Sequence, residues 1–544
     1  MPGGRTALAA LALLGAAVLA LGLHGAPSAH AQGRPNVVVI QTDDQTLGQL
    51  RAVAPSPYGG TGPVMPNTLN LIGAAGADFR RYYVSDPLCC PSRATTLTGR
   101  YAHNNGVRGN GPGPGGGYMA FDRQNNLAVW LQNAGYRTIH LGKFLNLYGQ
   151  QPYSDPRDVP PGWSDWETLV GEDSTHYFYG YTLNVNGNLV GPFGDLSYQT
   201  KDPAGCPDNA PQLELCNYQT DVLTRRAVQQ IELSSEAPFF LSLDYIAPHG
   251  DFQPPDGPEP APRHYNTLTS VPLPRPPGFN ERDVSDKPYF IRRAPRLTGT
   301  EIQRATVEYQ KELESLRAVD DGVGKIIDAL QRTGQLDDTY VFFISDNGFF
   351  EGEHRLSRAK FLAYEPSTHL PLLLRGPGIP PGVKPGALVG NVDLAPTILQ
   401  LTGAAASLPL DGTSVLPFAQ NPALRSRRPL LLEAFTKAVD IGTARGGAQA
   451  SIAAPPEDYH GILAGNYKYI RYSNGTVEAY DLGKDPYELH NFRGMPRYRR
   501  VLGFLGNTLR LLAHCAGPGC RPKLPKRLPR PLPRHSPAGH GHSG

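Results

Sequence analysis

Two adjacent cysteines open a short segment whose residue types suit the binding of an anion. The segment begins at Cys89 and reads C-x-P-S-R-x-x-x-L-T-G-R. Pro91 suits the first turn of a helix, Ser92 can satisfy free amide groups there, and Gly99 can end the helix. Residue 89 then lies at a helix N-terminus, where the dipole and the open N–H groups favour an anion. Arg93 adds a planar fork of N–H donors beside it.

A second set of side chains offers oxygen ligands for a metal ion. Asp43 and Asp44 follow one apolar run, and Asp346 with Asn347 follows another. Carboxylate and amide oxygens are hard ligands that suit Ca²⁺ or Mg²⁺, whereas zinc prefers histidine and cysteine. An Asp-Asp pair alone is usually an exposed turn. Four such ligands after two predicted strands indicate a metal site instead.

The elements that must position these residues alternate between strands and helices. Buried strands are predicted at 36–40, 138–141, 239–245 and 340–344, and helices at 120–134 and 301–332. This alternation predicts an α/β fold with a large mixed, mostly parallel central sheet flanked by helices. Ligands of such folds gather at the carboxyl ends of the strands, which is where the polar clusters of this chain fall.

The cysteine segment resembles the signature motif of the sulfatase family, whose fold is alkaline phosphatase-like. The family's first motif cysteine is oxidised enzymatically, so the resemblance implies formylglycine at Cys89 and a formylglycine-generating enzyme as maturation partner. The aldehyde hydrate carries two hydroxyls, of which one attacks sulfur and the other expels the sulfate. A disulfide between Cys89 and Cys90, or two buried thiols, is the alternative, although adjacent cysteines rarely pair without strain.

The resemblance also implies a set of charged residues around residue 89. The implied ligands of one calcium, with Mg²⁺ or Mn²⁺ as alternatives, are Asp43, Asp44, Asp346 and Asn347. Lys143 matches the sulfate-contacting lysine, His249 the histidine of the A-P-H motif, and Lys360 the lysine at the leaving oxygen. Together with Arg93 and the cation, the lysines would hold the developing charge, while His249 or Lys360 protonates the leaving alcohol. Taken singly, lysines are usually solvated and histidines structural.

One position departs from the family pattern. Many sulfatases carry K-x-H where this chain has Lys143-Phe144-Leu145, so the base of the elimination step is open and His249 is the candidate. The G-K-x-L-N pattern resembles the branch of N-acetylglucosamine-6-sulfatases and heparan endosulfatases, and the resemblance spans roughly residues 35–491. Three further side chains either touch the sugar or sulfate or brace loops, namely Asn146, His176 and His354.

Three functions compete at this stage. The leading one is an exported, calcium-dependent sulfatase acting on a sulfate monoester, either a sulfated sugar such as N-acetylglucosamine 6-sulfate or an aryl sulfate. The second is a phosphodiesterase or phosphonate monoester hydrolase on the same scaffold. The third is a catalytically inactive protein that binds sulfated glycans. Nucleic acid is not expected as a partner, nor is a membrane once the signal is removed.

The N-terminus is typical of a secretory signal. Arg5 precedes an apolar stretch at 7–23, and Ala29-His30-Ala31 has the small-x-small cleavage pattern. The mature chain would begin near Gln32 and be secreted or held in the cell envelope. An uncleaved membrane anchor is the alternative, but the Ala/Gly-rich stretch is short for a span.

Length and local pattern predict how the 544 residues are divided. After about residue 421, short strand-like pieces with close turns and a hairpin signal at Asn474-Gly475 indicate an antiparallel unit. We therefore predict a signal peptide at 1–31, a catalytic α/β domain at 32–420, a small antiparallel C-terminal subdomain at 421–500 and a C-terminal segment at 501–544.

The remaining cysteines and the net charge describe the exported chain further. Six cysteines fit an exported protein, and the short spacings suggest the disulfides Cys206–Cys216 and Cys515–Cys520. Zinc binding by these cysteines is the alternative, but the sequence contains no C-x-x-C motif. The formal charge of +3 comes from the tail after Cys520, without which the body is slightly acidic. This basic, Pro-rich tail is predicted to be disordered and serves either as a solubilising end or as a contact for polyanions.

Overall fold

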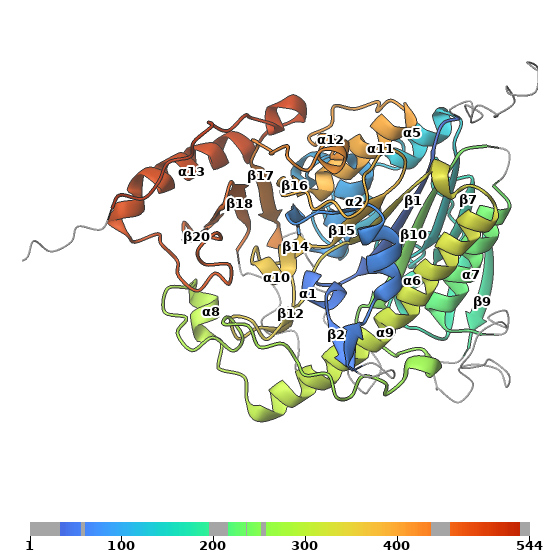
Figure 1. The fold of residues 1–544 in the computed structure, drawn as a ribbon, viewed down its shortest axis with the longest axis horizontal. Coiled ribbons are helices and arrows are strands. Elements are labelled where there is room, and N and C mark those ends of the chain that lie inside the picture. The colour runs from blue at the N-terminus through green and yellow to red at the C-terminus, as the bar shows by residue number, and fades with distance from the viewer. Residues whose placement is uncertain are drawn as a thin grey trace, which may run out of the picture. The chain divides into compact units, whose positions relative to one another are not determined.

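A mixed sheet organises the computed structural model of the chain (Figure 1). The residues described are 33–55, 60–194, 216–234, 237–251, 257–436 and 457–533, and the predicted signal at 1–31 lies outside them. Within these residues the sheet has nine strands, whose spatial order is β4 (Ala77–Asp78), β15 (Leu372–Arg375), β11 (Thr339–Ser345), β1 (Asn36–Asp43), β10 (Phe239–Pro248), β6 (Arg137–Gly142), β7 (Asp165–Leu169), β8 (Tyr181–Val185) and β9 (Asn188–Phe193).

The middle of this sheet is parallel and its two edges are antiparallel. Strands β11, β1, β10, β6 and β7 pair in parallel, while β15 and β4 on one side and β8 and β9 on the other run antiparallel. Parallel neighbours bring their carboxyl ends to the same edge of the sheet. The predicted α/β class with a mostly parallel central sheet is confirmed.

Both faces of the sheet are covered, which explains the unbroken apolar run of β1. Side chains alternate between the faces, so Val38 and Ile40 join one buried cluster, and Val37 and Val39 join the other. A strand that is buried on both faces has no side chain in contact with solvent, and its sequence is therefore continuously hydrophobic.

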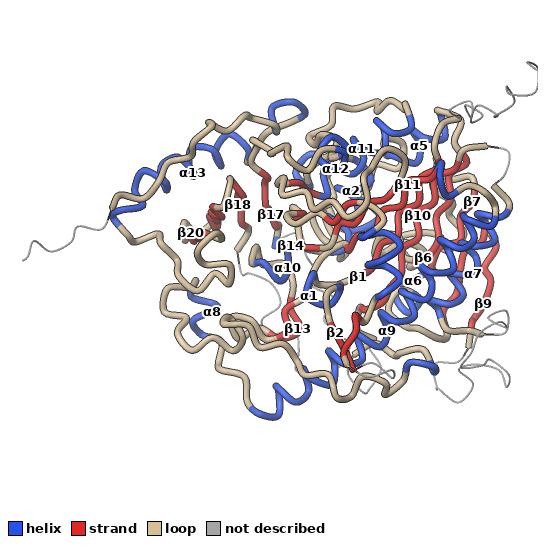
Figure 2. Tube along the Cα trace, viewed as in Figure 1, coloured by secondary structure: helices blue, strands red, loops and turns tan. Residues whose placement is uncertain are grey.

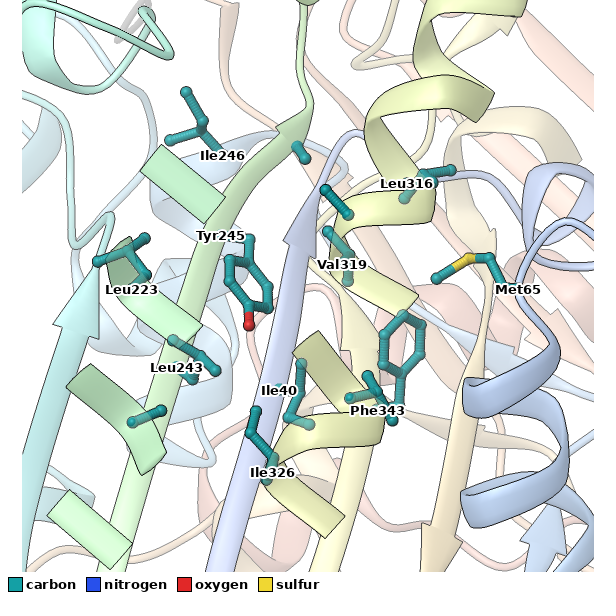
Figure 3. Packing of buried hydrophobic residues seen from close by; sticks show 14 of the residues in the cluster. Ile40, Met65, Leu223, Leu243, Tyr245, Ile246, Leu316, Val319, Ile326 and Phe343 are labelled. Carbon is teal, nitrogen blue, oxygen red and sulfur yellow. The ribbon is translucent and has the colours of Figure 1, made fainter. Parts of the chain in front are cut away.

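One face packs against α7 (Gln219–Glu232), α9 (Gly299–Arg332) and the π-helix η1 (Thr68–Ala74). Figure 3 shows Leu316, Val319 and Ile326 of α9 lying over side chains of β1, β10 and β11. The helix begins with a capping box in which Thr298 accepts from the Glu301 amide, while the Glu301 side chain accepts from the Thr298 amide. The predicted helix at 301–332 is confirmed with nearly the same bounds.

The opposite face is covered by α2 (Cys89–Thr98), α5 (Leu127–Asn133) and α11 (Leu394–Thr402), as Figure 2 shows. The single helix predicted at 120–134 is wrong in its first half. The chain instead forms the short α4 (Gly117–Ala120), turns, and restarts at Asn126, whose side chain accepts from the amides of Ala128 and Val129. Asparagine is a strong N-cap, and it sets the start of α5 here.

A second, four-stranded antiparallel sheet forms near the C-terminus. Its strands are β17 (Leu430–Ala434), β18 (Tyr459–Ala464), β19 (Tyr467–Tyr472) and β20 (Val477–Asp481). Helix α13 (Arg499–Leu512) packs on β18 and β19. The predicted antiparallel unit is confirmed, whereas its boundary with the catalytic domain stays a prediction. Cys515 and Cys520 form a disulfide, and Cys206 of the other expected pair lies outside the described residues.

The structure differs from the disorder predicted after Cys520. Residues 521–533 pack against the C-terminal sheet, where Leu524 is buried and its amide donates to the Arg427 carbonyl over 2.6 Å. Leu528 joins the same apolar cluster. The leucines among the basic residues supply the apolar contacts that a composition-based reading overlooks.

Short elements complete the fold. They are α1 (Leu47–Leu50), β2 (Val53–Pro55), β3 (Thr61–Pro63), β5 (Tyr82–Tyr83), α3 (Ala102–Asn105), α6 (Gly171–Ser174), α8 (Tyr289–Arg293), β12 (Phe350–Glu351), β13 (Ser357–Ala359), α10 (Glu365–Thr368), β14 (His369–Leu370), β16 (Val389–Gly390) and α12 (Leu416–Gln420). Among the helices in the described ranges, none is both long and apolar enough to cross a bilayer.

Candidate active site

Helix α2 carries Cys89 at its first position. Leu88 before it is extended, and Gly99 ends the helix in the left-handed conformation with φ of 63°. The amide of Cys90 is satisfied by Asn110 Oδ1 at 2.9 Å rather than by Ser92, whose hydroxyl instead lies 3.1 Å from Asn391 Nδ2. The predicted helix is confirmed, and the capping role expected for Ser92 is wrong because that hydroxyl is engaged by another segment.

The four candidate metal ligands meet at the ends of two neighbouring strands. β1 and β11 run parallel with Thr42 opposite Ser345, so Asp43 and Asp44 come level with Asp346 and Asn347. The Asp44 amide donates to Asp346 Oδ1 over 3.2 Å, and the Asn347 side-chain amide donates to Asp44. Asp44 holds a left-handed conformation with φ of 69°, which turns the chain sharply at the strand end.

These ligands fit a hard divalent cation. Ligand atoms of Asp43, Asp346 and Cys89 lie within 4.8 Å of one another, as do those of Asp43, Asp44 and His249. Asn347 Oδ1 is buried and accepts no hydrogen bond within the described part of the chain. A buried acceptor without a donor is costly, and a cation beside three carboxylates would satisfy it. The donor set therefore suits Ca²⁺ or Mg²⁺ better than zinc.

Two lysine ammonium groups converge on Cys89. Lys143, directly after β6, is fully buried, donates to Asp43 and lies 4.0 Å from Cys89 Sγ. Lys360 donates to Asp44 Oδ1 over 2.6 Å and lies 3.3 Å from the same sulfur. Burial alone would lower their pKa values, but the nearby carboxylates outweigh it and raise the pKa of both. Both lysines are therefore cationic.

Arg93 turns toward the carboxylates behind the sulfur. Its Nε donates to Asp346 Oδ2 over 2.8 Å, and its Nη1 donates to the Lys143 carbonyl at 2.8 Å and to Asp244 Oδ1 at 3.2 Å. Burial opposes its charge, yet Asp346 and Asp43 raise the pKa of Arg93 above its ordinary value. Nη2 forms no hydrogen bond within the described residues and lies 3.5 Å from Asp43 Oδ2. Arg93 therefore links the carboxylates of the site, and its contact with a sulfate oxygen stays a prediction.

Asp244 is a site residue that the sequence analysis missed. It lies near the end of β10, is buried, and accepts from Gln41 Nε2 at 2.8 Å and from Ser242 Oγ at 2.6 Å, besides Arg93. Burial raises the pKa of Asp244 to about 6, against the pull of the arginine. An aspartate within the apolar run 239–245 was the available signal, because such a carboxylate needs a buried partner.

His249 and His176 face each other beside the carboxylates. His249 follows β10, its Nε2 lies 3.7 Å from Asp44 Oδ2 and its Nδ1 lies 2.8 Å from the Gly250 carbonyl. The two imidazole centroids are 5.1 Å apart. Burial lowers the pKa of His249 to about 3, so its imidazole is neutral. A neutral imidazole whose Nδ1 donates to a carbonyl presents Nε2 as a proton acceptor.

The other expected residues lie in different settings. Asn146 contacts Cys90, with its amide 3.0 Å and its Oδ1 3.3 Å from that sulfur, and so braces the start of α2. His354 lies 2.6 Å from Glu281 and against the Tyr364 ring at 4.4 Å. Leu145 is buried in the apolar cluster under α2 and α5, and its side chain has no group that could accept a proton in the reaction. These contacts fit the bracing alternative for Asn146 and His354, and a contact of either residue with the sugar or sulfate stays a prediction.

Comparison with known proteins identifies the class of enzyme. A family profile described as Sulfatase matches residues 35–404. The N-acetylglucosamine-6-sulfatase of Capra hircus is 32% identical over 526 residues, which cover 92% of this chain and 87% of the goat protein. The chain therefore belongs to the sulfatase family and is a sulfuric ester hydrolase, similar to N-acetylglucosamine-6-sulfatases.

Two solved structures share the fold. One is described as a complex with its substrate D-glucosamine-2-N,6-O-disulfate. It is 23% identical and has a TM-score of 0.67, and the match covers 97% of that protein and 88% of this chain. The other is the phosphonate monoester hydrolase of Agrobacterium radiobacter, 22% identical with a TM-score of 0.64, covering 96% of that protein and 89% of this chain. Both confirm the alkaline phosphatase-like fold.

Proposed function

We propose that this sulfatase is exported and removes sulfate from sulfated sugars, using formylglycine at residue 89 and one bound calcium. N-acetylglucosamine 6-sulfate is the first candidate substrate, because the goat relative carries that specificity in its name. Export rests on the signal pattern at 1–31, and maturation requires a formylglycine-generating enzyme. The observation that carries the proposal is the convergence of Lys143 and Lys360 on Cys89 beside the four hard ligands.

The surroundings of Cys89 favour a formylglycine at this position over an unmodified thiol as the nucleophile. The residue is 1% exposed, and burial raises the pKa of the thiol despite the two lysines. A neutral thiol is a weak nucleophile. Sγ stands in for the nucleophilic oxygen that a formylglycine hydrate carries on the same carbon, and such a hydrate supplies both an attacking and an expelling hydroxyl. The weak nucleophilicity of the buried thiol, compared with that of the hydrate, supports oxidation of Cys89 before turnover.

The side chains around residue 89 can each take part of the reaction. Lys143 and Lys360 offer two fixed cations for the sulfate oxygens, which stabilise the charge that develops as the S–O bond breaks. Lys360 lies on the accessible side, with 13% of its side chain exposed, and can deliver a proton to the leaving oxygen. A cation on Asp43, Asp44, Asp346 and Asn347 would supply further polarisation of the ester.

His249 is proposed as the acceptor of the proton from the second hydroxyl. Its imidazole is neutral and lies at the carboxylate cluster, whereas Leu145 replaces the histidine that many sulfatases use. Arg93 is proposed to act through the carboxylates, keeping Asp43 and Asp346 in place. His176 is placed beside His249 and is proposed to orient that ring.

Mass analysis of the tryptic peptide containing residue 89 tests the proposal. Conversion of the thiol to an aldehyde lowers the peptide mass by about 18 Da. The same preparation is assayed for sulfate release from N-acetylglucosamine 6-sulfate and an aryl sulfate, with an aryl phosphate diester as control. Active protein with an unaltered thiol, or turnover of the phosphate diester alone, contradicts the proposal.

A further inference from the structure

The last part of the chain is basic without any acidic residue to balance it. After Glu488 no aspartate or glutamate occurs up to the end of the sequence. Within residues 489–533 the exposed cations are Arg493, Arg499, Arg500, Arg510, Lys523, Lys526, Arg527 and Arg530. None of these eight side chains forms an ion pair with a described residue. We call this set the C-terminal basic surface.

The C-terminal basic surface is held on the folded chain. Helix α13 lies beside β18 (Figure 1). Its apolar face packs against the C-terminal sheet and consists of Val501, Leu505, Leu509 and Leu512, whereas the arginines of the helix are exposed. Arg499, Arg500 and Arg510 are thus displayed from a packed helix rather than from a solvated tail. Fixed charges lose less conformational entropy on binding than charges on a flexible segment.

The following segment is fixed to the same sheet. The Leu532 amide donates to the Arg497 carbonyl over 3.0 Å, and the Tyr467 hydroxyl donates to the Pro529 carbonyl at 3.4 Å. Leu524 is buried and Leu528 half-buried, while Lys523 before them and Lys526 and Arg527 between them are exposed. Lys523 and Arg530 are seven positions apart, a span of at most about 25 Å in an extended chain.

From this arrangement we propose that the C-terminal basic surface binds a linear sulfated polysaccharide and so tethers the polymer that carries the substrate groups. The choice of polysaccharide rests on the proposed function, since the same chain would cleave sulfate esters of such a polymer. Charges spaced along an extended segment and a helix suit a chain with an anionic group on successive units.

Two other polyanions fit the surface less well. Proteins that bind single-stranded nucleic acid stack its bases on exposed aromatic rings, but among residues 489–533 Phe492 and Tyr498 are buried and Phe504 is half-buried. An amphipathic helix that lies on a membrane inserts its apolar face, whereas the apolar face of α13 is already covered by the sheet. The sulfated polysaccharide uses the cations without needing either feature.

The test compares two variants that each lose three positive charges. The surface variant carries Lys523→Gln, Lys526→Gln and Arg527→Gln. The matched control carries Arg293→Gln, Arg296→Gln and Lys384→Gln, which are exposed residues outside the segment. Both are made in a Cys89→Ala background for binding and in the active protein for kinetics. Circular dichroism and thermal unfolding establish that both remain folded.

Binding to heparin is measured as a function of salt concentration. We expect the surface variant to bind about ten-fold or more weakly, and the slope of log affinity against log salt to fall by about 2 to 3. The control should keep the slope of the parent. In the active background, the KM for desulfation of the polysaccharide should rise while kcat on a small aryl sulfate stays unchanged.

The outcomes separate this inference from the proposed function. Equal heparin affinity of the surface variant and the control overturns the inference, and so does tighter binding to duplex DNA or to vesicles with anionic lipid. Because the binding assay uses Cys89→Ala protein, it needs no turnover. A failure to release sulfate from any substrate contradicts the proposed function and leaves the binding result standing.

Discussion

Arg93 Nε donates to Asp346 Oδ2 over 2.8 Å across 253 residues of sequence. The same guanidinium reaches the Lys143 carbonyl and Asp244, so one side chain links α2 to the ends of β11, β6 and β10. A buried arginine needs compensating acids, and here the acids are also candidate metal ligands or their neighbours. The position of residue 89 is thereby coupled to the position of the candidate metal ligands.

Loss of Cys89 should abolish turnover without unfolding the protein. We expect Cys89→Ala to lower sulfate-ester hydrolysis at least about a thousandfold, because it removes the proposed nucleophile. Cys90→Ala is the matched control: it loses the contact with the Asn146 amide, at about 1 kcal/mol of stability, but should keep the mass change at residue 89. Aryl sulfate turnover and thermal unfolding are the measurements. Comparable activity in both variants would contradict the assignment.

Removal of Asp244 should weaken the site through Arg93. Asp244→Ala leaves the buried guanidinium with one acid fewer, so we expect a loss of roughly 3 kcal/mol in unfolding free energy and a lower kcat. Asp244→Asn keeps an acceptor for Nη1 and should lie between the wild type and the alanine variant. Denaturant unfolding and steady-state kinetics measure this. If the alanine variant matches the wild type in both, Arg93 does not depend on Asp244.

Metal removal should lower both activity and stability. A ligand that binds only the folded state stabilises it by about 2.7 kcal/mol at a hundredfold excess over its Kd. We expect a chelator to lower the unfolding temperature and calcium to restore it. Asn347→Ala should lose most of this response, because Asn347 Oδ1 is a candidate ligand that is buried and has no donor among the described residues. Identical melting of the wild type with chelator and with calcium is the contrary result.

Glu478 should make the protein less stable as pH rises. It is buried in β20, and burial raises its pKa to about 8, although the Tyr364 hydroxyl at 2.8 Å and Lys287 act against this. A folded-state pKa above the unfolded value near 4.5 means that the stabilisation is full below pH 4.5 and is lost by about pH 8. Glu478→Gln cannot ionise, so its unfolding temperature should fall less between pH 5.5 and roughly 8.5. Parallel pH profiles of the two proteins would exclude this role.

Truncation should distinguish the packed from the undescribed part of the C-terminus. Ending the chain after Cys520 removes Leu524 and Leu528 from the apolar cluster, and burying such a side chain contributes about 1.5 to 3 kcal/mol. We therefore expect a lower unfolding temperature for this truncation. A chain that ends after Pro533 keeps both leucines and should unfold like the full-length protein. Equal melting of the two truncations would show that residues 521–533 add no stability.

The strand ends show where sequence was sufficient. Asp43 and Asp346 were predicted to meet because each follows a continuous apolar run, and parallel strands end at the same edge of a sheet. The start of α2 at residue 89 followed from Pro91 and Gly99 in the same way. These are local signals, since they depend on backbone preferences and on side-chain alternation within a few residues.

Other features were decided by tertiary structure alone. The pairing of Arg93 with Asp244, the break in the helix expected at 120–134 and the docking of residues 521–533 depend on which segments become neighbours. Sequence determined the chemistry available to this protein, namely the cysteine of a sulfatase motif, hard oxygen ligands and lysines. Folding decided their partners, because a buried charge takes whichever counter-charge the packed chain brings within hydrogen-bond distance, and that distance is not encoded in any one segment.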